Sequence, residues 1–423
     1  MTAPNILIIG GGIGGLCLAH GLKKHHIPFH VYERDGTQDY RAQGYRIRVA
    51  REAVTALRYL FSPETWRLFE LTCAESVFSD IPEVDAGTAK VDLPRVANGE
   101  SPAAAGGRNG PSSELKGYTV DRTMFRQVLL RGLEEHMTWG KALKEYAITD
   151  DGVVARFRDG SSAEGSLLVG ADGSHSAVRK QFLPAHPILD TGARCVYGKT
   201  LLTPELLKTL EPAITKGGMM VVKDRSRDPV TAMILEPVIF THREEMLAEG
   251  IEAPHDYLYW VMGAKPEALG LPHEGMPTLT PEQCEKIARG VAQSWHPRVR
   301  PVVACQQPGQ TAVLQINSVP SDFGTWEPNE RVTLIGDSIH LMGPTAGSGA
   351  ITAIRDAELL CRLLVEGGQG KAMIAKYESG MREYASEVVH RSWAAAEVIF
   401  NQRQGEDKHI GEVMIATRNG KMK

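Results

Sequence analysis

Three glycine-rich segments of this chain carry residues that can bind a nucleotide. The first segment, residues 10–15, reads GGGIGG and satisfies the pattern G-x-G-x-x-G through Gly10, Gly12 and Gly15. Glycines in such a turn let backbone N–H groups approach a pyrophosphate, which then lies at the positive end of a helix dipole. Glu33 ends the next apolar run, where a carboxylate can accept hydrogen bonds from a ribose diol. These residues predict a dinucleotide site, and they fit NAD and FAD equally well.

Two distant segments repeat the design and favour a flavin. Residues 167–179 read LLVGADGSHSAVR, and residues 332–349 read VTLIGDSIHLMGPTAGSG. Each places an aspartate, Asp172 or Asp337, directly after an apolar run and next to glycine. In the third segment the carboxylate can hold ribityl hydroxyls, while N–H groups at the start of the following helix bind the pyrimidine edge of a flavin.

The elements that must position these residues follow from the apolar pattern. Short apolar runs at 5–9, 27–32, 167–169 and 332–335 predict strands buried on both faces of a parallel sheet. Helical spacing follows the first and third glycine segments, at 16–25 and 350–364, and one or two amphipathic helices are expected over 371–404. The pattern changes in the middle of the chain. Alternation and β-branching there predict one mostly antiparallel sheet, with strands at 194–197, 218–222, 230–240, 257–262 and 311–316.

Together the three motifs resemble a known enzyme family. GxGxxG (10–15), GADGxxSxVR (170–179) and GDxxHxxxPxxGxG (336–349) are similar to the FAD-dependent aromatic hydroxylases of the p-hydroxybenzoate and salicylate hydroxylase type, the class A flavoprotein monooxygenases. Residues 33–34, 43–47 and 120–122 also resemble this family, and the likeness extends from residue 5 to about residue 365. Ser338 and Ser348 depart from the usual Ala and Gln, but neither departure removes a carboxylate or a glycine.

The resemblance implies an α/β fold, with a Rossmann-like FAD-binding domain and an inserted, mostly antiparallel β-sheet substrate domain. The FAD-binding domain would be discontinuous and comprise residues 1–75, 118–185 and 322–423. The substrate domain would comprise residues 76–117 and 186–321, including a flexible loop rich in Gly and Pro at 95–117. That loop is either an inert linker or a lid over the substrate.

The resemblance also assigns residues to the cofactor, position by position. Glu33 should bind the adenosine ribose, Arg122 the phosphate or ribityl region, and Asp337 the ribityl or pyrophosphate part. Residues 347–350 should lie near the isoalloxazine, and Asp172 should serve the joint between the domain, the cofactor and the reductant path. The full expected FAD set is Gly10, Gly12, Gly15, Glu33, Arg34, Arg46, Arg122, Asp172, Asp337, Gly347, Gly349 and Ala350.

By the same resemblance the chain is expected to be an FAD-dependent monooxygenase of secondary metabolism. NAD(P)H would bind transiently and reduce tightly bound FAD, and O₂ would form a flavin C4a-hydroperoxide that hydroxylates or epoxidises an aromatic or alkene-containing molecule. Baeyer–Villiger oxidation, epoxidation with rearrangement, and flavin binding without turnover remain alternatives. The divergent middle favours a bulky aromatic or polycyclic substrate. Arg194 and Tyr197 are the first candidates for substrate activation, because they begin the first strand after the second motif. His340 is expected to be a packed or helix-capping residue and is assigned no chemical role.

Composition excludes several other classes of protein. A length of 423 residues fits two or three domains, and 47 Lys and Arg against 51 Asp and Glu give a net charge of −4, which disfavours a nucleic-acid partner. The six cysteines form no CxxC pair, and no set of residues has metal-ligand spacing, so neither a disulfide scaffold nor a metal site is expected. Without a cationic leader or a run of about 18 apolar residues, we expect no membrane span and a cytoplasmic monomer or homodimer.

Overall fold

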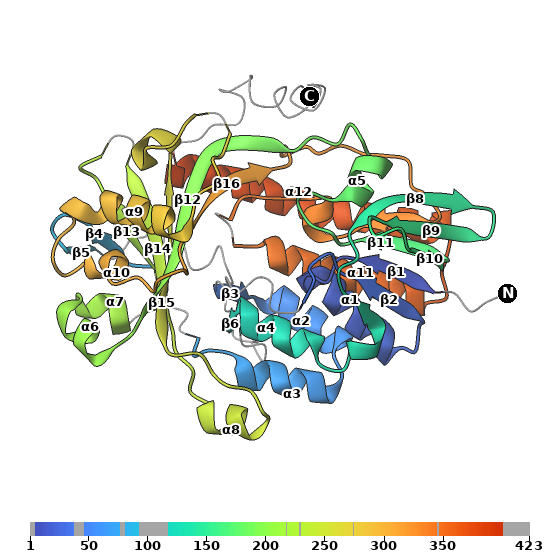
Figure 1. The fold of residues 1–423 in the computed structure, drawn as a ribbon, viewed down its shortest axis with the longest axis horizontal. Coiled ribbons are helices and arrows are strands. Elements are labelled where there is room, and N and C mark those ends of the chain that lie inside the picture. The colour runs from blue at the N-terminus through green and yellow to red at the C-terminus, as the bar shows by residue number, and fades with distance from the viewer. Residues whose placement is uncertain are drawn as a thin grey trace, which may run out of the picture.

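The structure, a computed structural model, describes residues 5–37, 46–76, 81–92, 117–216, 218–227, 230–273, 275–344 and 347–400. It consists of two parts that lie side by side in Figure 1. The right-hand part of that view contains a five-stranded sheet, and the left-hand part contains a seven-stranded sheet. None of the described helices has the length and apolar character needed to cross a membrane.

A parallel sheet forms the core of the right-hand part. Its strands run in the order β17-β11-β1-β2-β7, and every neighbouring pair is parallel. The strands are β1 (Ile6–Ile9), β2 (Phe29–Tyr32), β7 (Met137–Thr138), β11 (Leu167–Gly170) and β17 (Val332–Leu334). β1, β11 and β17 are buried along their whole length, which explains why their sequences are continuously apolar.

Helices from both ends of the chain pack around this sheet. They are α1 (Ile13–Lys24), α2 (Arg51–Leu60), α3 (Pro63–Thr72), α4 (Arg122–Leu130), α5 (Ala177–Phe182), α11 (Gly349–Val365) and α12 (Lys371–Phe400). α1, α2 and α11 meet at Gly21, where a Cβ atom would lie 2.5 Å from Leu60 and 2.8 Å from the Cys361 sulfur. The absence of a side chain at Gly21 therefore lets helices from opposite ends of the chain come into contact. α12 extends further and contacts β14 and β15 of the other part.

A small antiparallel sheet, which the sequence pattern does not predict, lies beside the parallel sheet. It contains β8 (Leu143–Thr149), β9 (Gly152–Phe157) and β10 (Ser162–Gly165), in the order β10-β9-β8. β8 and β9 alternate between buried and exposed residues only in part. The alternation signal of a half-buried strand is correspondingly weak in this stretch.

The left-hand part is built on a seven-stranded sheet in the order β16-β12-β15-β14-β13-β4-β5. Its strands are β4 (Glu83–Asp85), β5 (Val91–Asp92), β12 (Leu189–Leu201), β13 (Met220–Asp224), β14 (Thr231–Val238), β15 (Tyr257–Ala264) and β16 (Ala312–Ser318). All neighbouring pairs are antiparallel except β13 and β4. The prediction of a mostly antiparallel sheet is confirmed.

Short helices accompany the seven-stranded sheet. These are α6 (Pro204–Thr209), α7 (Pro212–Lys216), α8 (Arg243–Ala248), α9 (Pro281–Val291) and α10 (Pro301–Ala304), with 3-10 turns at Pro266–Leu269 and Ala292–Ser294. A separate apolar core forms on this side, and its largest buried side chain is Trp260. Since β11 and β17 are neighbours in the parallel sheet, the strands β12 to β16 of the seven-stranded sheet come between two adjacent strands of the parallel sheet in the chain. The exact domain boundaries stay predictions, and residues 95–116 of the expected loop lie outside the described residues.

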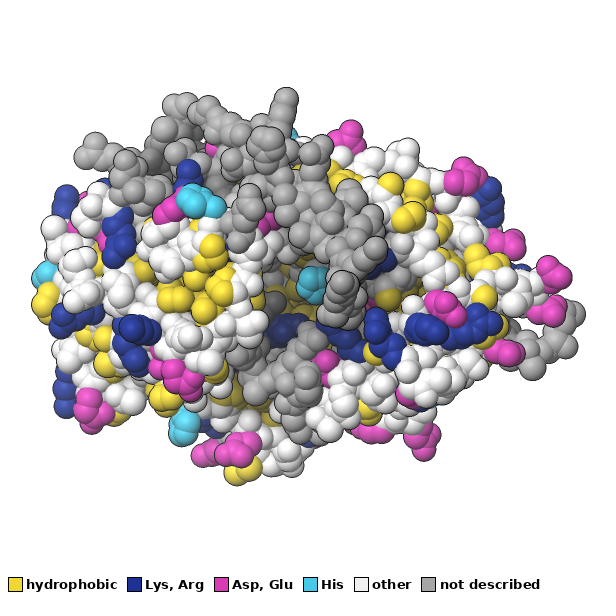
Figure 2. All heavy atoms as spheres, turned by 45° about the horizontal axis from the view of Figure 1, so that its top comes forward, with side chains coloured by type: hydrophobic (Ala, Val, Ile, Leu, Met, Phe, Trp, Pro, Cys, Tyr) yellow, Lys and Arg dark blue, Asp and Glu magenta, His cyan; other side chains and the backbone are white. Residues whose placement is uncertain are grey.

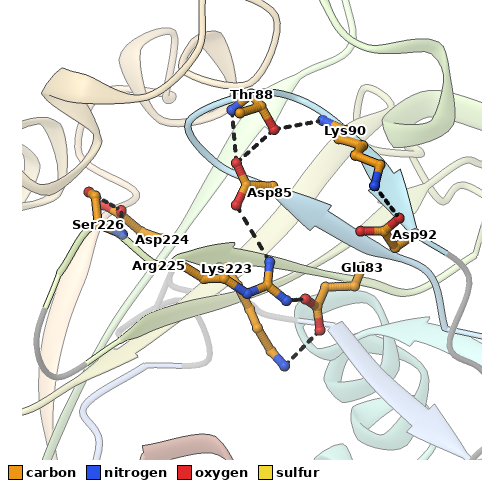
Figure 3. Close-up of polar contacts among 9 residues, drawn as sticks. All are labelled: Glu83, Asp85, Thr88, Lys90, Asp92, Lys223, Asp224, Arg225 and Ser226. Atoms are coloured by element: carbon orange, nitrogen blue, oxygen red, sulfur yellow. Dashed lines mark hydrogen bonds and ion pairs between the residues drawn. The ribbon is translucent and has the colours of Figure 1, made fainter.

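A network of partly exposed ion pairs connects β4 and β13, close to the β5 end of the seven-stranded sheet (Figure 3). Glu83 of β4 pairs with Lys223 of β13 at 2.6 Å and with Arg225, which also reaches Asp85. Each exposed pair stabilises the fold by at most about 1 kcal/mol. Because its charges are paired with one another across neighbouring strands, this network has a structural explanation without any ligand.

The indole ring of Trp260 lies so close to the backbone of the neighbouring strand that this strand requires a glycine, Gly198, at the contact. Gly198 of β12 pairs with Trp260 of β15, and a Cβ at Gly198 would lie 2.4 Å from the buried indole ring. The indole cannot move away easily because its Nε1 donates a hydrogen bond to Thr200 Oγ1 at 3.1 Å.

We therefore predict that Gly198→Ala lowers the free energy of unfolding by roughly 1–3 kcal/mol, the usual cost of overpacking a core. Urea unfolding followed by circular dichroism measures the change. The control is Gly290→Ala in α9, where no atom lies within 4 Å of the added Cβ. That variant should be as stable as the wild type or more stable by up to about 1 kcal/mol, because alanine favours a helix. Equal unfolding midpoints for the two variants would contradict the assigned packing.

Candidate functional site

The first glycine-rich turn is formed by very close backbone contacts. Gly10 has a φ of +114°, and a Cβ there would lie 2.3 Å from the carbonyl oxygen of Ala171. A Cβ at Gly15 would lie 2.1 Å from the carbonyl oxygen of Gly10. Gly12, in contrast, has no atom within 4 Å of its Cβ position. The turn is thus tight on its protein side and open at Gly12, as a backbone that receives a phosphate group requires.

The two long helices that follow glycine-rich turns begin without a side-chain cap. The residue before α1 is Gly12, which has no side chain, and the Ser348 side chain before α11 accepts no capping hydrogen bond. Neither helix has an acidic residue in its first turn. Asp121 and Ser176, by comparison, cap α4 and α5. Uncapped first-turn N–H groups and the helix dipole attract an anion or an electron-rich ring edge, and both helix ends fit such a group.

Glu33, the residue that follows β2, stabilises the first glycine-rich turn through hydrogen bonds. Its side chain is buried, and its two carboxylate oxygens accept hydrogen bonds from the backbone N–H groups of Gly11, at 2.6 Å, and Asp35, at 2.9 Å. The carboxylate thus lies beside the glycine-rich loop, as the sequence predicted. Its contact with a ribose stays a prediction. Arg34 is exposed.

Asp172 and Ser338 connect the second and third turns. Asp172 accepts hydrogen bonds from the Ala177 N–H at 2.6 Å and from the Ser176 hydroxyl, so it orders the start of α5. Ser338 Oγ accepts a hydrogen bond from the Gly173 N–H at 3.0 Å, and Arg179 donates to the Ser338 carbonyl at 2.9 Å. The serine that departs from the family pattern therefore joins two turns whose strands are neighbours.

Asp337 combines an enclosed position with an exposed side chain. It lies in the 3-10 turn Gly336–Ser338, and its side chain is accessible to solvent although protein surrounds it. Desolvation raises the pKa of Asp337, while the positive charges of His340 and Arg122 act in the opposite direction. A Cβ at Gly349 would lie 3.8 Å from Asp337 Oδ1, so the carboxylate is next to the start of α11. An accessible carboxylate beside an uncapped helix start suits a polar cofactor.

A polar interface lies between the two parts of the molecule. A two-stranded sheet of β3 (Arg46–Val49) and β6 (Tyr118–Asp121) contacts one face of the seven-stranded sheet there. Arg46 pairs with Glu236 of β14 and lies over the ring of Tyr259, at 5.4 Å from its centroid. Arg48 also bonds Glu236, at 2.9 Å. The structure thus places Arg46 at this interface, and a contact between Arg46 and FAD stays a prediction.

A second set of contacts joins the same two surfaces. Lys199 of β12 donates to Asp121 Oδ2 at 2.8 Å, and the Tyr257 hydroxyl donates to the same oxygen at 2.6 Å. The other oxygen of Asp121 caps α4, which begins at Arg122. Burial and the nearby Asp121 carboxylate raise the pKa of Tyr257 well above its usual value, so its hydroxyl stays protonated. This interface therefore connects the seven-stranded sheet directly to the helix that carries Arg122.

The structure separates the two residues expected to activate a substrate. Arg194 lies on the same face of β12 as Val196, which belongs to the separate apolar core of the seven-stranded sheet. Tyr197 and Lys199 lie on the opposite face of the strand. Arg194 is completely buried, and its guanidinium bonds both oxygens of Asp190 and the Gly275 carbonyl. Its charge is compensated there and faces away from the polar interface, so the geometry does not support a substrate role for Arg194. Tyr197 stays a candidate.

The residues in place fit the expected cofactor. Gly12, the ends of α1 and α11, and the accessible Asp337 carboxylate provide open N–H groups and an acceptor along one edge of the parallel sheet. On the face of the molecule that Figure 2 shows, Lys and Arg side chains gather in a band over the right-hand half. Within the described part of the chain, no three His, Cys, Asp or Glu residues are grouped to hold a metal ion.

Several residues of the site lie outside every motif that is visible in the sequence. Lys199, Glu236 and Asp356 belong to no motif, and only the pairing of distant strands or helices reveals their contacts. Asp121 precedes Arg122 at the head of a helix, and that position was a usable signal for a cap.

Two protein-family models match segments of the chain. Residues 8–70 match an NAD(P)-binding Rossmann-like domain, and residues 281–395 match an FAD binding domain. The first segment contains the tight turn and Glu33, and the second contains Asp337 and α11.

Curated proteins with similar sequences carry the same cofactor in their names. The chain is 36% identical over 456 residues to the dual O-methyltransferase/FAD-dependent monooxygenase elcB of Phaeosphaeria nodorum, covering 96% of this chain and 47% of that protein. It is also 36% identical to the protein of the same description, CTB3, of Cercospora beticola, covering 94% of this chain and 46% of that protein. The chain thus spans about half the length of these relatives.

Solved structures share the whole fold. One from Photorhabdus luminescens, described as a candidate FAD-containing monooxygenase, has a TM-score of 0.76 at 27% identity and covers 94% of this chain and 99% of that one. A salicylate hydroxylase in complex with its substrate has a TM-score of 0.68 at 18% identity, over 99% and 94% of the two chains. The fold class and the FAD cofactor expected from the sequence are confirmed.

We predict that Asp337→Ala weakens FAD binding by roughly 10- to 100-fold, the equivalent of losing hydrogen bonds to a charged group. Quenching of flavin fluorescence during titration of the apoprotein measures the affinity. The matched control is Asp322→Ala, which removes an exposed carboxylate that bonds only the Gly324 N–H among the described residues. FAD affinity at the wild-type level in Asp337→Ala would contradict the assigned site.

We also predict that Arg194→Met is a stability variant. The substitution leaves Asp190 buried without its cation, at a cost of roughly 3–5 kcal/mol of unfolding free energy. Removing both charges in Arg194→Met/Asp190→Leu should recover part of that loss. Thermal unfolding of the FAD-loaded proteins measures both effects. A variant of normal stability that fails only in substrate binding would restore Arg194 to the substrate site.

Proposed function

Because the chain belongs to the class A flavoprotein monooxygenases, we propose that it is an FAD-dependent monooxygenase that uses NAD(P)H and O₂ to hydroxylate or epoxidise an aromatic or alkene-containing small molecule. The observation that carries the proposal is the accessible Asp337 carboxylate next to the uncapped start of α11, at the edge of the parallel sheet where all three glycine-rich turns lie. A dehydrogenase that binds only NAD would not need the second and third turns.

The chain's own residues bind, orient and shield the reactants. When bound, FAD supplies the redox chemistry, namely acceptance of a hydride from the nicotinamide and activation of O₂. The turn at 10–15 and Glu33 are proposed to hold its adenosine half, and Asp337 with the start of α11 its flavin half. The buried ion pairs of Arg46 and Arg48 with Glu236 close the interface against water beside this site.

We propose that the substrate lies against the inner face of the seven-stranded sheet. Three side chains of that face, Tyr197, Lys199 and Tyr259, come from neighbouring strands, because Lys199 of β12 is the register partner of Tyr259 in β15. Aromatic rings at this surface suit a flat, bulky substrate, and the Lys199 ammonium suits an oxygen substituent on it. Lys199 takes the place that the sequence analysis gave to Arg194.

The relatives suggest what else the substrate carries. Two of them combine O-methyltransferase and FAD-dependent monooxygenase in one name, and this chain matches about half of each. A molecule that meets both activities needs a hydroxyl group that can accept a methyl group as well as a ring or alkene that can accept oxygen. We therefore propose an oxygenated aromatic of secondary metabolism, bearing free hydroxyl or methoxy substituents.

The FAD-loaded protein tests this proposal directly. With a panel of polyhydroxylated naphthalenes and anthraquinones and their methyl ethers, at least one compound should accelerate NADH or NADPH oxidation, with O₂ uptake. Mass spectrometry under ¹⁸O₂ should show one labelled oxygen atom in the product, and the position of the label distinguishes hydroxylation or epoxidation from Baeyer–Villiger insertion. Stable reduced flavin and no labelled product with any compound would favour a flavin-binding protein without turnover.

A charge-removing variant tests the placement of the substrate. Lys199→Met should raise KM for a hydroxylated substrate by roughly tenfold, the cost of losing a hydrogen bond to a charged group, with a smaller change in kcat. Because the variant also leaves the buried Asp121 without its cation, it should lower the free energy of unfolding by roughly 3–5 kcal/mol, so KM is measured on the folded, FAD-loaded protein. Lys223→Met is the control, since that lysine of β13 pairs with Glu83 in the partly exposed network near the β5 end of the same sheet (Figure 3). An unchanged KM in Lys199→Met would place the substrate elsewhere.

A further inference from the structure

A fully buried carboxylate, Asp356 of α11, lies directly behind the third glycine-rich turn. Its Oδ2 accepts a hydrogen bond from the backbone N–H of Gly336 at 2.7 Å and contacts His340 Nε2 at 2.6 Å. Its Oδ1 accepts a hydrogen bond from the Tyr384 hydroxyl of α12 at 2.7 Å. The side chains of Asp356 and His340 have no solvent exposure.

These contacts converge on the backbone that holds Asp337. Gly336 precedes Asp337 and has a φ of +62°, a left-handed conformation that favours glycine. The bond from its N–H to Asp356 ties this turn to α11, whose start lies beside the Asp337 carboxylate. One side chain therefore links the turn, the helix that begins at the flavin end of the site, and α12.

A buried charge in this position needs an explanation beyond fold stability. Desolvation makes a buried ion pair a weak contributor to stability, and apolar residues of similar size often replace such pairs without loss. Asp356 lies among apolar residues of the large core, including Ile354, Ala357 and Leu360. Another leucine there would serve packing alone, whereas a carboxylate provides acceptors for a backbone N–H group and a histidine.

His340 carries the effect of Asp356 to the cofactor side. Burial acts to lower the pKa of His340, but the carboxylate of Asp356, its hydrogen bond and the charge of Asp337 outweigh burial and raise it. The positive charge of His340 in turn favours the ionised form of Asp337. The order of charges from the core outward is thus Asp356, His340 and Asp337.

We propose that Asp356 is a positioning residue of the FAD site, which holds the turn at 336–338 through the Gly336 N–H and orients the His340 ring, so that the Asp337 carboxylate is presented to the cofactor. This inference rests on the proposed contact between Asp337 and FAD. Asp356 itself is shielded from the cofactor and acts only through the turn and through His340.

Asp356→Asn tests the proposal, because the amide preserves the shape and removes the charge. Its FAD dissociation constant, measured by titrating the apoprotein, should rise roughly tenfold, the loss expected for one hydrogen bond to a charged group. Histidine ¹⁵N NMR provides a readout that a purely structural role would not move. The His340 resonance is assigned as the signal that disappears in His340→Gln. Its chemical shift should be that of an imidazolium in the wild type and that of a neutral ring in Asp356→Asn.

Asp224→Asn is the matched control. Asp224 is equally buried and accepts hydrogen bonds from the Trp295 indole and from Ser226, but it lies in β13 of the seven-stranded sheet. This variant should lose stability without any change in FAD affinity or in the His340 resonance. Equal weakening of FAD binding in both variants, or wild-type affinity in Asp356→Asn, would overturn the proposal.

A milder variant keeps the test decisive if Asp356→Asn does not fold. Tyr384→Phe removes one of the three donors to Asp356 and leaves its charge in place. FAD affinity should fall only a few-fold, and His340 should stay cationic, whereas loss of the imidazolium signal would contradict the assigned order of charges. If Asp337→Ala retains FAD, the cofactor site itself is wrong. If only the Asp356 variants behave as wild type, this inference alone fails.

Discussion

The parallel pairing of β1, β11 and β17 is the constraint on which the rest of the structure depends. In the observed register Ile9 lies beside Gly170, and Gly170 lies beside Leu334, so all three strands end at the same edge of the sheet. Parallel strands present their carboxyl ends together, and ligands of open α/β sheets bind at that edge. The three turns therefore meet although more than a hundred residues separate each from the next in the chain.

Close strand pairing also explains the glycines. The carbonyl of Ala171, at the end of β11, occupies the place where a side chain at Gly10 would lie, and the carbonyl of Gly10 does the same at Gly15. The first turn is thus shaped by its neighbour in the sheet and by its own helix. Ser338 and Arg179 continue the same principle, since their hydrogen bonds connect the second and third turns. The result is one continuous binding edge made of three local motifs.

The two parts of the molecule meet through charges as well as through apolar packing. Glu236 forms ion pairs with the two arginines of β3, and Asp121 accepts hydrogen bonds from Lys199 and Tyr257 of the seven-stranded sheet. Buried ion pairs add little net stability, but each demands a specific geometry. These pairs therefore define how the seven-stranded sheet is oriented relative to β3, β6 and the helix that begins at Arg122.

The sequence by itself determined the three turns, their strands and the cofactor, because each motif is local: the glycines, the carboxylate and the flanking apolar run lie within a few residues of one another. Only the tertiary structure decided which side chains face the site. Alternation along β12 shows that Arg194 and Lys199 lie on opposite faces, but not which face is turned inward, and a register shift between Asp190 and Arg194 adds to the ambiguity. The pairing of Arg46 with Glu236, and of Asp356 with both the third turn and α12, depends on contacts between distant elements, which leave no periodic trace in the sequence.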